Sequence, residues 1–324
     1  MRWTKGVKFG LAAVIASAAC DVPQEPIETE ERGYVIYNGW GCRTCGYKNS
    51  PSLGAHAIAD FTLGQQGGPG MALVSIEDTG GSRYDVTIEA EGILALTSKG
   101  IRSGTSIVGW SLIFERPSGG EIPVVIELYE EHPDWVAGDP IPTYGLSYLA
   151  GPTGEGVPAS VCEDTSLENT SVVFLVGERY DQTTKTVIPG QSDYVSAACR
   201  DHALMKLKFT GHDPTDAYGS SPEERQAGLK MFTADYCGTG ESFTKFGVDL
   251  DWQDRIGNFP GGWGLGLNTL EARWDEDGAR CLGTPRYANR DHVLDRCELA
   301  GVELEACGGD PLDLDGFAWG SYLP

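Results

Sequence analysis

The chain has 324 residues, of which 24 are lysine or arginine and 47 are aspartate or glutamate, so its formal charge at pH 7 is −23. Such a charge repels nucleic-acid phosphates and argues against a nucleic-acid partner. A chain of this length can bury a core in one large or two medium domains, and its 44 glycines and 18 prolines favour strands and turns over a helical bundle.

Residues 1–19 have the three zones of a secretory signal peptide. Arg2, Lys5 and Lys8 supply positive charge, an apolar run follows, and residues 16–19 are small. The uncharged run up to Cys20 is shorter than the ~20 apolar residues that a spanning helix needs. Residues 20–32 are acidic and contain prolines, which is typical of a flexible tether.

Cys20 is a predicted lipidation site. Ala18-Ala19-Cys20 resembles the lipobox of bacterial lipoproteins, with Ser17 where that motif usually carries leucine. If Cys20 is acylated, eight cysteines remain, an even number that suits disulfide bonds in an oxidising compartment: Cys42, Cys45, Cys162, Cys199, Cys237, Cys281, Cys297 and Cys307. We therefore expect an exported protein that is anchored in the cell envelope, at the outer membrane or cell surface. Cleavage after Ala19 without acylation, and soluble secretion, is the alternative.

Residues 33–155 are expected to form a β-rich N-terminal region. Turn signals separate several β-prone runs, which are 34–40, 71–77, 83–98, 105–115 and 122–130. A Gly-containing triplet at 118–120 lies between the apolar segments 110–114 and 124–128, and therefore predicts a β-hairpin. Residues 134–168 are expected to be rich in loops with one strand near Tyr148, and 172–178 is a further predicted strand.

A capped helix is the clearest predicted element of the C-terminal half. Ser221 can cap it, Pro222 suits the first helical position, and Glu224 completes a capping box. Gly238, directly after Cys237, provides the stop signal. A shorter helix is expected over 201–209.

The remaining residues are predicted to form a hairpin and a tail. The pair Asp277-Gly278 is typical of a hairpin turn. The Cys-containing tail, 291–324, includes a short stretch with helical character at 293–299. The predicted fold is thus α+β and mainly β, with short antiparallel strands and hairpins, two short helices in the C-terminal half, and disulfide cross-links.

The capped helix ends in the sequence Ala234-Asp235-Tyr236-Cys237, and related sequences accompany it. They are Gly-Glu-Arg-Tyr-Asp at 177–181, Ala-Cys at 198–199, His-Ala-Leu-Met-Lys at 202–206, Glu-Ala-Arg-Trp at 271–274 and Gly-Ala-Arg-Cys-Leu at 278–282. With this pattern the chain resembles the ADYC domain family of exported bacterial proteins, with residues 156–290 as the ADYC-like domain. The resemblance implies export and a cysteine-stabilised domain, and it implies no established activity.

The residue types of the motif indicate a structural role. Tyr236 can pack in a core while its hydroxyl finds a partner, and Asp235 can accept N–H groups of the turn at 238–240. Cys237 can be tied to a strand or to a second helix. If its partner is Cys199, the closed loop would stabilise the fold by roughly 4 kcal/mol.

Two other patterns leave chemical alternatives open. Cys42 and Cys45 have the spacing of a redox-active dithiol, although a structural disulfide within their Gly-flanked turn, or two bridges to other parts, is the favoured interpretation. Asp310, Asp313 and Asp315 have the spacing of a calcium loop but lack the downstream Glu of an EF-hand, so a solvated acidic turn is the favoured interpretation and a calcium site is the alternative.

The sequence contains no recognisable catalytic constellation. The five histidines are dispersed, and neither His-Glu-x-x-His nor Gly-x-Ser-x-Gly occurs. We therefore expect a noncatalytic cell-envelope lipoprotein with a structural or binding role, attached to the membrane by its lipid and facing an unknown envelope protein or polymer. The alternatives are an envelope enzyme that acts on a polymer through carboxylates, and a calcium-dependent adhesion or binding module.

Overall fold

The computed structural model describes most of the chain after residue 50. The described ranges are 51–53, 56–64, 70–90, 92–150, 156–162, 171–200, 202–215, 218–244, 250–259, 269–287 and 289–323, together with the backbone of two short paired strands, β1 (Ile27–Glu28) and β2 (Val35–Ile36). The predicted signal peptide, Cys20, Cys42 and Cys45 lie outside the described residues. No helix in the described ranges is long and apolar enough to cross a membrane.

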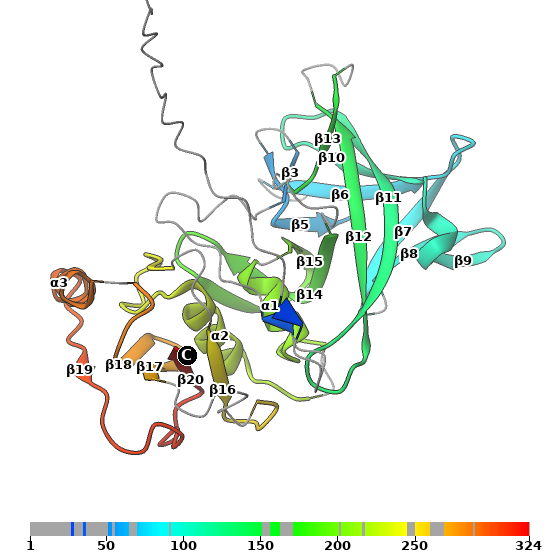
Figure 1. The fold of residues 1–324 in the computed structure, drawn as a ribbon. Helices are drawn as coiled ribbons and strands as arrows, with labels where there is room; N and C mark the ends of the chain where they lie inside the picture. The colour runs from blue at the N-terminus through cyan, green and yellow to red at the C-terminus, as the bar shows by residue number, and fades with distance from the viewer. Residues whose placement is uncertain are drawn as a thin grey trace, which may run out of the picture.

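Seven strands close into a barrel, which occupies the upper right of Figure 1. Around the ring they are β5 (Asp60–Leu63), β6 (Met71–Glu77), β10 (Ser111–Glu115), β11 (Glu121–Pro133), β12 (Pro140–Leu149), β14 (Ser171–Asp181) and β15 (Thr186–Cys199). The β5–β6 pair is parallel and the other pairs are antiparallel. The predicted hairpin at 118–120 is present as β10–β11.

Smaller elements extend or border the barrel. From the end of β6 the sheet continues through β7 (Arg83–Glu89), β8 (Gly92–Thr97) and β9 (Gly100–Ser103), and the 3-10 helix η1 (Gly104–Ile107) follows. The short strands β3 (Ser52–Leu53) and β4 (His56–Ala57) pair with each other, and β13 (Pro158–Ser160) adds to β12.

Aromatic side chains fill the barrel. Phe61 contacts the rings of Phe114 and Phe174 edge-on, with ring centroids 5.1 and 6.1 Å apart. Tyr144 packs on Phe174, and its hydroxyl accepts a hydrogen bond from Ile93 N at 2.8 Å. These side chains are buried, so the interior is a packed core.

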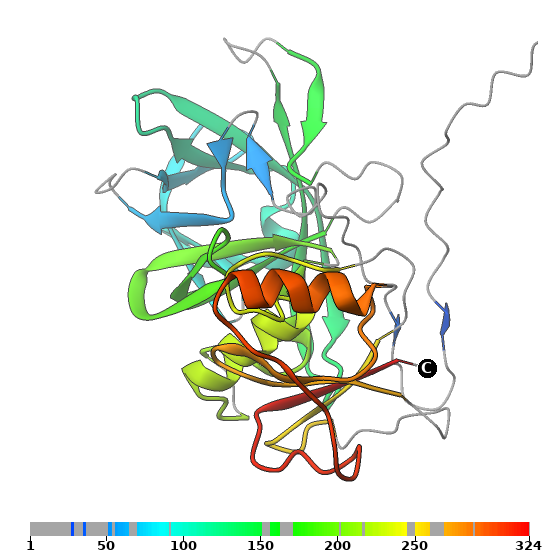
Figure 2. The same cartoon turned by 90° about the vertical axis from the view of Figure 1, so that its left-hand side faces the viewer.

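The C-terminal half packs helices against a second sheet. Its helices are α1 (Ala203–Phe209), α2 (Pro222–Thr233) and α3 (Arg290–Leu299). Its five-stranded sheet has the order β16 (Asp251–Asp254), β20 (Trp319–Leu323), β17 (Thr269–Asp275), β18 (Gly278–Leu282) and β19 (Glu305–Ala306). The helix α3 lies on the outside of this half, away from the barrel (Figure 1, Figure 2).

The strand β14 joins the two halves because it is buried on both faces. Val172 and Phe174 belong to the barrel core, whereas Val173 and Leu175 belong to the core of the C-terminal half. Alternate side chains of a strand point to opposite faces, so a continuous apolar run serves both cores. The expected boundary at residue 155 therefore runs through the barrel, since β14 and β15 complete it.

The expected fold class is wrong in two respects. Strands account for 47% of the structure and helices for 14%, but the strands form a closed barrel instead of separate antiparallel hairpins. Three helices are present in the described residues where two were expected, because the tail residues 290–299 form α3. The strand expected near Tyr148 is the ten-residue β12, and it is longer than expected because its two prolines and Gly145 hide its strand character.

Candidate functional site

The Ala234–Cys237 motif forms the turn that ends α2. As predicted, Ser221 and Glu224 form a capping box at the start of this helix. At its end Ala234 adopts a left-handed conformation with φ of 50°, and its N–H donates to the carbonyls of Lys230 and Met231. All four motif residues are at most 4% exposed.

Asp235 forms a buried ion pair with Lys230 of α2. The Lys230 Nζ donates to Asp235 Oδ2 at 2.8 Å, and also to the carbonyls of Thr184 at 2.8 Å and Gly238 at 3.1 Å. Asp235 Oδ2 accepts Gly240 N at 2.7 Å, which confirms the predicted turn contact. Burial raises the pKa of Asp235, although Lys230 and the turn N–H groups oppose this shift.

Tyr236 belongs to a second buried network. Its hydroxyl donates to Glu271 of β17, and Arg286 donates to the same carboxylate through Nε at 2.8 Å and a terminal nitrogen at 2.6 Å. Burial alone would raise the pKa of Glu271, but Arg286 outweighs it and holds that pKa below its ordinary value. Trp274 stacks on the Tyr236 ring, with centroids 5.2 Å apart. The motif tyrosine therefore packs and bonds within the core.

The end of the motif is fixed by a disulfide and by close backbone packing. Cys237 is bonded to Cys297 of α3. Gly238 has a positive φ, and a Cβ at this position would lie 1.8 Å from the carbonyl oxygen of Asp277 in the β17–β18 hairpin. Only glycine allows this approach, so the turn and the hairpin are held together.

The family-like sequence 177–181 and the helix α1 take part in further buried ion pairs. Glu178, in the 177–181 sequence, accepts Arg225 Nε of α2 at 2.9 and 3.0 Å and the Tyr180 hydroxyl at 2.9 Å. Lys208 of α1 pairs with Asp213 at 2.8 Å. Sequence reasoning missed these basic partners and also Lys230. For Lys208 and Lys230 the usable signal was a cation inside an apolar helical segment, since a buried charge requires a partner.

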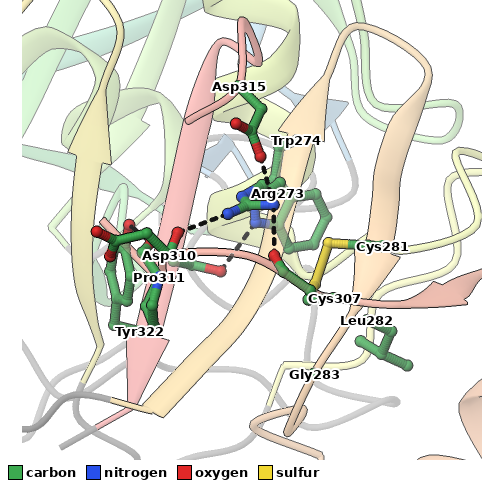
Figure 3. The surroundings of a disulfide bond; sticks show 12 residues. Arg273, Trp274, Cys281, Leu282, Gly283, Cys307, Asp310, Pro311, Asp315 and Tyr322 are labelled. Atoms are coloured by element: carbon green, nitrogen blue, oxygen red, sulfur yellow. Dashed lines mark hydrogen bonds and ion pairs between the residues drawn. A yellow bond between two sulfur atoms is a disulfide. The ribbon is translucent and has the colours of Figure 1, made fainter. Parts of the chain in front are cut away.

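Arg273 of β17 organises the acidic tail, for which the sequence left a solvated turn and a calcium loop open (Figure 3). Its guanidinium donates to the carbonyls of Gly308 at 3.0 Å and Asp310 at 2.7 Å, and it pairs with the Asp315 carboxylate at 3.0 Å. The carboxylates of Asp310 and Asp313 accept backbone N–H groups of their own turns. Among the described residues, no group of three or more His, Cys, Asp or Glu side chains is placed to hold a metal ion.

Disulfide bonds are confirmed, with pairings that the sequence did not settle. Cys162 is bonded to Cys199, and Cys281 is bonded to Cys307 beside Arg273. The pairing of Cys199 with Cys237 is therefore not formed. Cys199 ends β15 and belongs to the barrel core, whereas Cys237 belongs to the core of the C-terminal half.

These features define a mainly β, disulfide-linked barrel protein whose motif is a buried structural junction. The chain belongs to the ADYC domain family, which it matches over residues 104–288. No curated protein and no solved structure matches it. The matched segment starts at η1 and stops before α3, so it omits β5 and β6 of the barrel and also the disulfide partners Cys297 and Cys307.

Proposed function

We propose that the protein is a noncatalytic cell-envelope lipoprotein with a structural or binding role. In this proposal residues 1–19 direct export, and Cys20 carries the lipid that attaches the mature chain to the outer membrane or cell surface. The supporting observation is the complete burial of the family motif, in which Asp235 and Tyr236 are 0% exposed and bonded within the core. Side chains that do not reach solvent cannot contact a ligand, so the burial of the motif favours a structural role over a catalytic or binding one.

The three disulfides found among the described residues favour export. Structural disulfides persist in oxidising compartments outside the cytosol and are rare inside it. Two of them join the motif turn and the β18 strand to the C-terminal tail, whose strands β19 and β20 also pair with β18 and with β16 and β17. Cross-links of this kind suit a domain that must stay folded in the envelope.

The charge of the chain favours a partner with basic groups. Most of the described arginines and lysines already contact a carboxylate of the protein. The surplus of acidic over basic residues therefore remains as negative surface charge. Such a surface attracts cationic groups of an envelope protein or polymer and repels nucleic acid.

Intact mass measured on protein from the host's membrane fraction tests this proposal. Free thiols are alkylated with and without prior reduction, and a Cys20→Ser variant serves as the control. We expect a chain that starts at an acylated Cys20 and takes up alkyl groups only after reduction, whereas the variant leaves the membrane fraction. An unacylated wild-type chain would contradict the anchor. Release of soluble fragments from host envelope polymer by the purified protein would contradict the noncatalytic role.

A further inference from the structure

A histidine and an aspartate face each other in the core of the C-terminal half. His212 follows α1, and Asp254 is the last residue of β16. Both side chains are 1% exposed, and His212 Nε2 lies 3.7 Å from Asp254 Oδ2. Neither atom has a hydrogen-bond partner within the described residues. Because 3.7 Å is too long for a hydrogen bond, two buried polar atoms point at each other without forming one.

The other ring nitrogen of His212 determines which hydrogens are present. Nδ1 lies 2.8 Å from the carbonyl oxygen of Thr210. A carbonyl oxygen can only accept, so Nδ1 carries a hydrogen and Nε2 of the neutral ring presents a lone pair. An ionised Asp254 also presents only lone pairs. The two facing atoms therefore need one additional proton before they can bond.

The pair joins three segments of the fold. Asp254 Oδ1 accepts Gly257 N at 2.7 Å and Phe259 N at 3.3 Å, and so shapes the loop after β16. The His212 ring packs on Trp319 of β20, with ring centroids 4.3 Å apart. A bond between His212 and Asp254 would therefore connect the end of α1 directly to the loop after β16, beneath β20.

The surroundings keep the histidine neutral and favour protonation of the aspartate. Burial is the largest influence, and it lowers the pKa of His212 to about 4 and raises the pKa of Asp254 to about 6. From α2, Glu224 raises both pKa values and Arg225 lowers that of His212. Arg255, in the loop after β16, pairs with Glu224 at 2.9 Å.

We propose that His212 and Asp254 form a proton-sensing pair that takes up one proton from solvent on acidification and then closes into a hydrogen bond from Asp254 Oδ2 to His212 Nε2. In the protonated form the loop after β16 is tied to the end of α1. In the ionised form a buried carboxylate oxygen is unpaired and this junction is weaker. The contribution of the pair to stability is full below the ordinary pKa of Asp254 and is lost as the pH rises through its folded value.

Nitrogen-15 NMR of histidine-labelled protein, combined with urea unfolding, tests the pair. In the wild type we expect His212 to carry its hydrogen on Nδ1, and its Nε2 resonance to shift with a midpoint near pH 6. A His212→Gln variant assigns the signal. In Asp254→Asn the side-chain amide supplies a hydrogen at every pH, so the resonance no longer shifts. The wild type loses stability between pH 5 and pH 8 and this variant does not. The ratio of the variant's unfolding equilibrium constant to that of the wild type should therefore be about tenfold smaller at pH 8 than at pH 5.

The exposed residue Asp85 of β7 provides the matched control. Asp85→Asn removes the same charge at the surface, and its effect on unfolding should be equal at the two pH values. A His212 resonance that is identical at pH 5 and pH 8, or a ring with its hydrogen on Nε2, would overturn the proposal. If Asp254→Asn does not fold, the pH dependence and the hydrogen position of the wild-type His212 resonance are sufficient to support or overturn the proposal.

Discussion

Replacing Gly238 with alanine tests whether the motif turn is held by backbone contact with the β17–β18 hairpin. Gly238 has φ of +69°, and the added Cβ would lie 1.8 Å from the carbonyl oxygen of Asp277. That oxygen belongs to the backbone, so no side-chain rotation can relieve the overlap. The hydrogen bond from Ala279 N to Tyr236 O joins the two segments, and the Cys237–Cys297 disulfide fixes the turn to α3. The backbone itself must therefore move.

The expected loss of unfolding free energy is large for the addition of a single methyl group. A left-handed backbone costs an alanine about 1–2 kcal/mol, and overpacking a fixed site adds about 1–3 kcal/mol or more. We expect Gly238→Ala to lower the free energy of unfolding by about 4 kcal/mol. Urea unfolding of the oxidised protein, followed by tryptophan fluorescence, measures this change.

A second glycine separates the overlap from the backbone strain. Gly219 has φ of +76°, and nothing lies within 4 Å of a Cβ built on it. Gly219→Ala should therefore cost only the backbone strain, about 1–2 kcal/mol. If Gly238→Ala is no more destabilising than Gly219→Ala, the contact with the hairpin does not hold the turn and the reasoning fails.

Three further predictions concern the buried charges and the extent of the fold. Lys230→Met leaves Asp235 buried and unpaired and should cost about 3–5 kcal/mol in urea unfolding, whereas adding Asp235→Leu should recover much of this loss; an additive double variant would contradict the pairing. The pKa of Glu271 is lowered by Arg286, so its contribution to stability is present at neutral pH and is lost as the pH falls through and below the ordinary value of 4.5. In a pH series, the melting temperature of Glu271→Gln should fall less on acidification than that of the wild type. An equal fall in both proteins would refute this contribution of Glu271. A fragment limited to residues 104–288 lacks strands that close the barrel and two disulfide partners, so its circular dichroism and unfolding should show no cooperative fold.

Local signals in the sequence determined several elements of the C-terminal half. The Ser221, Pro222 and Glu224 signals correctly placed the start of α2, and Asp277-Gly278 correctly placed the β17–β18 turn. The acceptor role of Asp235 in the following turn was also predictable. Each of these features depends on residues a few positions apart, whose backbone geometry and hydrogen-bonding groups are fixed by residue type.

Only the tertiary structure decided the barrel, the disulfide pairs and the partners of the buried charges. The barrel closes through β6–β10 and β5–β15, which join segments that are distant in sequence. Glu271, Arg286 and Tyr236 meet because the β17 strand passes beside the motif turn. Non-local pairs leave no periodic or spacing signal along the chain, since any acidic residue could meet any basic one. The sequence thus determined where helices and turns begin, and packing determined which side chains meet.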